Sequence, residues 1–104
     1  MTSKERAYLK SLAMKEKATH QIGKDGITPE FTEAVREALE SRELVKISIL
    51  QNCFDDPREL ADTLAGRTKS QIVQIIGRKI VLYKQNNDPK KRRIFFGAKK
   101  EEKE

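Results

Sequence analysis

Three helix-start signals constrain this chain more than any other feature. Thr2-Ser3-Lys4-Glu5 has the form of a capping box, in which a hydroxyl and a later glutamate satisfy the first N–H groups of a helix. Thr28-Pro29-Glu30 combines an N-cap, a proline at the first helical position and an acid near the positive end of the dipole. Asp56-Pro57-Arg58-Glu59 repeats that logic. We predict three helices, the first running to about Lys17 and the third stopping at Gly66.

Runs with the composition of β-strands lie between and after these helices. Residues 20–22 read as a short strand, and residues 44–50 alternate as a half-buried strand does. Residues 71–76 and 79–84 flank Gly77-Arg78, which is a hairpin signal. The three consecutive apolar residues 80–82 suit an interior strand. The order α-β-α-β-α-β-β favours an α/β sandwich with the second and third helices together on one face.

Composition excludes several classes of protein. The 104 residues suffice for one compact domain, with 22 Lys and Arg against 16 Asp and Glu. One cysteine, Cys53, and one histidine, His20, leave no internal disulfide, CxxC motif or His-rich metal site. There is no apolar run of membrane-spanning length, no signal-peptide core, no P-loop and no dinucleotide fingerprint. We expect a cytoplasmic protein that is not an enzyme and has no cofactor, metal, membrane or small-molecule substrate.

The basic charge is concentrated near the C-terminus. Residues 89–104 have a net charge of +4, which leaves only +2 for residues 1–88. From Gln85 onward the composition is polar and charged. We therefore predict a folded domain at residues 1–86 and a basic, flexible tail at residues 87–104. Ile94-Phe95-Phe96 is the exception and could dock as an extra edge strand.

The loop Gly23-Lys24-Asp25-Gly26 lies between a predicted strand and a well-capped helix. Two glycines allow close approach of a ligand, and the helix N-terminus and Lys24 favour an anion, as in the GXXG loop of KH-type RNA-binding modules. The alternative is an ordinary turn in which Asp25-Gly26 supplies a positive φ. Asp25 repels phosphate unless it turns away or pairs with a neighbouring cation such as Lys24.

Several separated segments together carry a family resemblance. TSKERAYLKSLA, QIGKDGIT, EALESRELVKISIL and VQIIGRKIVLYK, in this order and spacing, resemble the CRM domain and, more narrowly, the small stand-alone bacterial YhbY-like proteins. The resemblance covers about residues 2–84. It implies a four-stranded mixed sheet with helices, similar to the C-terminal domain of translation initiation factor three, with the last strand inside the sheet. Asp25 and the basic C-terminal ending depart from the family pattern.

The resemblance also implies RNA binding through the GxxG loop and neighbouring basic residues. Bacterial relatives are associated with precursors of the large ribosomal subunit, and plant relatives with intron splicing. In the first helix, three basic residues fall within roughly 40° of one another and extend the predicted footprint. The predicted RNA-binding residues are Gly23, Lys24, Gly26, Arg6, Lys10, Lys17, Arg42, Lys46 and Arg78.

Other candidates have simpler interpretations. Tyr83 could stack on a base, but an interior strand favours a core position, and Phe54 also reads as core. We expect Cys53 to be a small buried residue and His20 to be structural.

The sequence therefore predicts a monomeric, non-catalytic RNA-binding protein that binds precursor ribosomal RNA and assists large-subunit assembly. The alternative is a protein-interaction module that docks a basic ribosomal protein or assembly factor through its acidic second and third helices. We expect Gly26→Asp to weaken RNA binding and to leave the fold intact.

Overall fold

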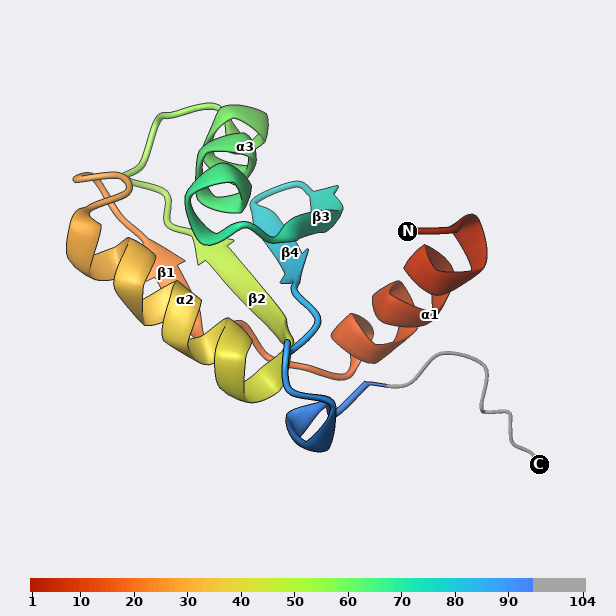
Figure 1. Cartoon of the computed structure of the whole chain (residues 1–104). Coiled ribbons are helices and arrows are strands. Elements are labelled where there is room, and N and C mark those ends of the chain that lie inside the picture. The colour runs from red at the N-terminus through yellow and green to blue at the C-terminus, as the bar shows by residue number, and fades with distance from the viewer. Residues whose placement is uncertain (95–104) are drawn as a thin grey trace.

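The structure is a computed structural model, and it describes residues 1–94 (Figure 1). The elements follow in the predicted order: α1 (Ser3–Met14), β1 (His20–Ile22), α2 (Pro29–Arg42), β2 (Leu44–Ile49), α3 (Pro57–Thr68), β3 (Gln71–Ile76), β4 (Lys79–Tyr83) and the 3-10 turn η1 (Pro89–Lys91). All three predicted N-caps form, and Thr2 and Glu5 close the capping box. Within residues 1–94 no helix is both long and apolar enough to cross a membrane.

The four strands form one mixed sheet in the order β1-β2-β4-β3. β1 pairs in parallel with β2, and the other two pairs are antiparallel. The interior position predicted for residues 80–82 is confirmed, because β4 lies between β2 and β3. β3 is an edge strand, and its register with β4 shifts between Ile72 and Gln74.

The helices cover both faces of this sheet, which confirms the α/β sandwich (Figure 1). α2 and α3 pack together on one face, as predicted, over Ile80 and Leu82 of β4. α1 packs on the other face, where Val81 and Tyr83 of β4 meet Leu9. Successive side chains of a strand point to opposite faces, so one strand supplies both cores.

Two helices end at other residues than the sequence predicted. α1 stops at Met14 rather than Lys17, and Lys46 of β2 donates to the carbonyls of Ala13 (3.2 Å) and Glu16 (3.3 Å) at that end. α3 continues through Gly66 to Thr68. Lys69 adopts the left-handed C-cap conformation expected of the glycine, with φ 56°.

One core prediction is wrong. Phe54 is 92% exposed, whereas Cys53 and Tyr83 are buried as expected. The reason lies in the connection from β2 to α3, which turns inward at Cys53 and then outward so that Asp56 can cap α3.

Glu43 makes the one-residue connection between α2 and β2. Its φ of 67° is uncommon for a residue with a side chain. Its N–H donates to the carbonyl of Leu39 (2.8 Å), and its carbonyl accepts from the N–H of Lys84 (2.9 Å). Both backbone groups are thus used where helix changes to strand.

The Glu43 carboxylate holds the chain that follows β4. The residue is fully buried. Its two oxygens accept three backbone N–H groups, from Asn86 (2.6 Å), Arg93 (2.6 Å) and Ile94 (2.8 Å). Ile94 is buried in the cluster beneath α1. Residues 86–94 are therefore fastened to the domain, while Phe95 and Phe96 lie outside the described residues. The domain boundary at residue 86 and the flexible tail stay predictions.

We predict that Glu43→Gln lowers the free energy of unfolding by about 2–3 kcal/mol, because an amide group would face N–H donors in a buried site. Denaturant unfolding measures this, and Glu40→Gln on the exposed surface of α2 serves as the control. Amide hydrogen exchange should accelerate at residues 86 and 93–94 in Glu43→Gln. Equal stability of the two variants would contradict this role.

Candidate nucleic-acid interface

Three loops meet at one end of the sheet. Because β1 and β2 are parallel, the β1–α2 loop (23–28) and the β2–α3 loop (50–56) leave the sheet at the same end of the strands. The β3–β4 hairpin (76–79) lies at that end too, because β4 is antiparallel to β2 and begins where β2 ends. Figure 1 shows the first two loops side by side at the left. We call residues 23–28, 50–56 and 76–79 the loop end.

The Gly23–Gly26 segment forms a tight turn. The N–H of Gly26 donates to the carbonyl of Gly23 (3.0 Å), and Gly26 has a φ of 68°. Lys24 and Asp25 are exposed at its tip, and their N–H groups have no acceptor within residues 1–94. Thr28 accepts the N–H of Phe31 (3.0 Å), so the helix end itself has fewer donors to offer. The tip of the turn therefore offers N–H groups to an anion.

The charge at this turn is balanced rather than strongly basic. The ion pairs among the described residues are Arg36 with Glu33 and Arg58 with Asp62, so Lys24 and Asp25 are not paired. A Cβ at Gly26 would lie 3.3 Å from an oxygen of Asp55. Gly26→Asp would thus combine backbone strain with a second carboxylate. Lys24 gives the cleaner test of this turn.

Arg78 braces the β2–α3 loop from the hairpin. Its Nε donates to the carbonyl of Ile49 (3.1 Å), and its Nη2 donates to the carbonyls of Leu50 and Cys53 (2.7 Å for Cys53). The Arg78 guanidinium therefore positions the neighbouring loop, and its predicted contact with RNA stays a prediction.

Arg6 and Lys10 lie along the β3 edge instead. Arg6 donates to the carbonyls of Ile72 (2.8 Å) and Val73 (2.9 Å), where the strand register shifts. With Lys10 and Arg58, it lines an open hollow along β3. Because α1 ends at Met14, Lys17 lies outside the helix and does not extend the row of basic side chains formed by Arg6 and Lys10.

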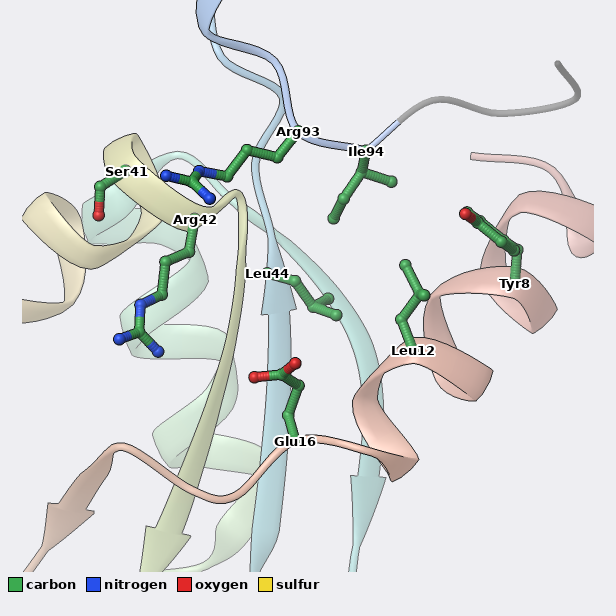
Figure 2. Close-up of a pocket in the computed structure, with 8 residues that line it drawn as sticks. All are labelled: Tyr8, Leu12, Glu16, Ser41, Arg42, Leu44, Arg93 and Ile94. Atoms are coloured by element: carbon green, nitrogen blue, oxygen red, sulfur yellow. The ribbon is translucent and has the colours of Figure 1, made fainter. Parts of the chain in front are cut away.

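Lys17, Arg42 and Lys46 line a small hollow elsewhere, near the start of β2. The 14 residues of α2 separate Arg42 from the loop end by about 20 Å. Arg42 also borders a larger hollow of about 530 Å³ between α1 and the chain after η1 (Figure 2). The structure thus gathers Gly23, Lys24, Gly26 and Arg78 at the loop end but not the other predicted residues.

His20 takes part in local packing. Its Nδ1 lies 2.8 Å from the Thr19 hydroxyl, and its ring meets Phe31 edge-on at 6.2 Å. Burial, with a smaller effect of Arg42, lowers the pKa of His20. Burial raises the pKa of Tyr83 to about 12, with smaller raising effects of Glu43 and Glu5 and an opposing effect of Arg92. These contacts and shifts fit the structural interpretation of both side chains. Among residues 1–94 no three His, Cys, Asp or Glu side chains form a metal-binding group.

Two residues, Glu43 and Phe54, have roles that the sequence did not predict. For Glu43 the sequence offers only one signal. It stands between a predicted helix and a predicted strand where no glycine is present to make the turn. Phe54 was assigned to the core from its apolarity alone, although the polar run Asp55-Asp56-Pro57 that follows it marks a loop.

Comparison with known proteins assigns the chain to a family. The model of the CRS1 / YhbY (CRM) domain matches residues 1–84. The chain belongs to the CRM domain family. Among its curated relatives, the probable RNA-binding protein YqeI of Bacillus subtilis is 41% identical over 90 residues, covering 86% of this chain and 94% of the relative. The probable RNA-binding protein PA4753 of Pseudomonas aeruginosa is 29% identical over 91 residues, covering 88% of each chain.

A solved structure has a similar fold. The solution structure of the hypothetical protein SAV1595 from Staphylococcus aureus, described as a candidate RNA binding protein, has a TM-score of 0.74 and 42% identity. The match covers 90% of this chain and 98% of that one. The fold class that the resemblance implied is thereby confirmed.

We predict that Arg78→Lys lowers the free energy of unfolding by about 1–2 kcal/mol although the charge is kept, because lysine cannot span three carbonyls. Urea unfolding tests this, with Lys79→Arg on the same hairpin as the control. Amide exchange at residues 50–53 should accelerate in Arg78→Lys alone. Unchanged stability and exchange would show that Arg78 does not brace the loop.

Proposed function

We propose that this chain is a monomeric, cytoplasmic and non-catalytic RNA-binding protein that uses its loop end to hold RNA. The observation that carries the proposal is the exposed turn at Lys24 and Asp25, whose N–H groups are available to a phosphate. Lys24 adds an unpaired cation at the same tip. The names of the curated relatives and of the solved neighbour support RNA as the ligand.

The footprint extends from the loop end along β3. Arg58 lies in the first turn of α3 and lines one hollow with Lys10 and Arg6. A phosphate backbone held at Lys24 would continue past Arg58 toward Lys10. Binding by a turn and scattered cations recognises shape and backbone more than sequence. Lys17, Arg42 and Lys46 would be reached only by a long RNA, because Arg42 is about 20 Å away at the other end of α2.

The cellular target proposed is precursor ribosomal RNA in large-subunit assembly, which the family resemblance suggests. Tagged protein followed through a sucrose gradient of lysate tests this. Wild type should sediment with large-subunit precursors, and Lys24→Glu should remain at the top. If both proteins remain at the top of the gradient, the proposed target is wrong. If both sediment with the precursors, the turn is not the site that holds them.

The rival function uses the acidic outer faces of α2 and α3. Glu30, Glu37 and Glu40 are exposed on α2, as are Glu59 and Asp62 on α3. Such faces repel RNA and favour a basic protein. Capture of a basic ribosomal protein that is lost with Glu37→Lys and kept with Lys24→Glu would favour this rival.

We predict that Lys24→Glu weakens binding of a hairpin RNA about tenfold at low salt and reduces the slope of log K against log salt by about 1. Fluorescence anisotropy of labelled RNA measures both. Arg67→Glu makes the same charge change at the exposed far end of α3 and should have little effect. Equal losses for the two variants would mean that only net charge matters and that the turn is not the site.

A further inference from the structure

The exposed aromatic ring at the loop end is not explained by the fold. Phe54 is 92% exposed and contributes nothing to either core cluster. Three of the six exposed large hydrophobic residues among residues 1–94 lie at the loop end, namely Leu50, Phe54 and Ile76. Exposed apolar side chains on the loops around a candidate binding turn indicate a contact surface.

The loop that carries the ring runs close to the turn that carries Lys24. A Cβ at Gly26 would lie 3.3 Å from the side chain of Asp55, and one at Gly23 would lie 3.7 Å from that of Asn52. The β2–α3 loop therefore runs directly beside the turn on both sides of Phe54. Arg78 fixes this loop through the carbonyl of Cys53, the residue before the ring. Phe54 is thus presented on a braced loop.

The charges around the ring decide which part of an RNA it can meet. Asp55 and Asp56 follow Phe54 directly, whereas the tip of the adjoining turn carries Lys24 beside Asp25. The two carboxylates next to Phe54 repel a phosphate, but they do not repel the uncharged face of a base. An aromatic ring offers a base stacking energy that depends little on sequence. The phosphate therefore belongs on the Lys24 side and the base on the Phe54 side.

We propose that Phe54 stacks on an unpaired base of an RNA whose backbone is held at the Gly23–Gly26 turn. This inference rests on the proposed RNA-binding function and specifies its ligand as RNA with a single-stranded segment. A fully paired helix keeps its bases stacked inside and cannot offer one to the ring. The loop end would thus distinguish single-stranded from double-stranded RNA.

Two variants separate the ring from the charge. Phe54→Ala should weaken binding of a hairpin RNA with an unpaired loop about fivefold or more at every salt concentration, with an unchanged salt slope. Its affinity for a fully paired duplex should equal that of wild type. Lys24→Glu should weaken both RNAs and reduce the slope. If wild type binds neither RNA, the proposed function fails and this inference with it. If wild type binds but Phe54→Ala binds the hairpin equally well, this inference alone is overturned.

A spectroscopic test does not depend on affinity. The chain contains no tryptophan, so Phe54→Trp places its only tryptophan at the site. Stacking on a base should quench its emission when the hairpin RNA binds. Thr63→Trp, at an exposed position of α3, is the matched control and should show no quenching. Unquenched Phe54→Trp in a complex that anisotropy shows to be formed would contradict stacking, and a protein partner would then be the better explanation of the exposed ring.

Discussion

β1 pairs in parallel with β2, with His20 opposite Ile47 and Ile22 opposite Ile49. A parallel pair needs a crossover connection, which α2 supplies. Because the two strands run in the same direction, the loops that follow them lie at the same end of the sheet. The glycine turn and the loop that carries Phe54 are neighbours for this reason alone. β4 runs antiparallel to β2, and Arg78 just before it therefore lies at the same end of the sheet. The candidate site is a product of strand direction, assembled from segments far apart in the sequence.

Several cations act on the protein's own backbone. Arg78 donates to carbonyls of the β2–α3 loop, Arg6 to β3 at its register shift, and Lys46 to the end of α1. Each one donates to carbonyls at a helix end, in a loop or at a register shift, where the regular hydrogen-bond pattern is interrupted. Glu43 does the converse, satisfying three N–H groups of residues 86–94. The count of basic residues therefore overstates the charge available to a polyanion, and Lys24 and Lys10 matter more than the total suggests.

Local signals in the sequence predicted most of the fold. Caps, the Gly77 hairpin and the apolar run 80–82 depend on neighbouring residues, and each was found where expected. The two wrong helix ends have different causes. α1 ends at Met14, where Lys46 from a distant part of the chain donates to the carbonyl of Ala13. α3 passes Gly66 because a nearby residue, Lys69, adopts the left-handed C-cap conformation. The glycine turn of the candidate site could be predicted from the sequence. Its position beside the loop that carries Phe54 could not, because it depends on the pairing of β1 with β2.

Amide chemical-shift mapping of the isotope-labelled protein with a hairpin RNA would locate the bound RNA residue by residue, and we expect it at the loop end. Binding at the loop end predicts the largest shifts at Lys24, Asp25 and residues 50–56, smaller shifts along β3 and at Arg58, and little change on the acidic outer faces of α2 and α3. Shifts concentrated around Glu33 and Glu37, or around Arg42 at the far end of α2, with the glycine turn unaffected, would contradict it.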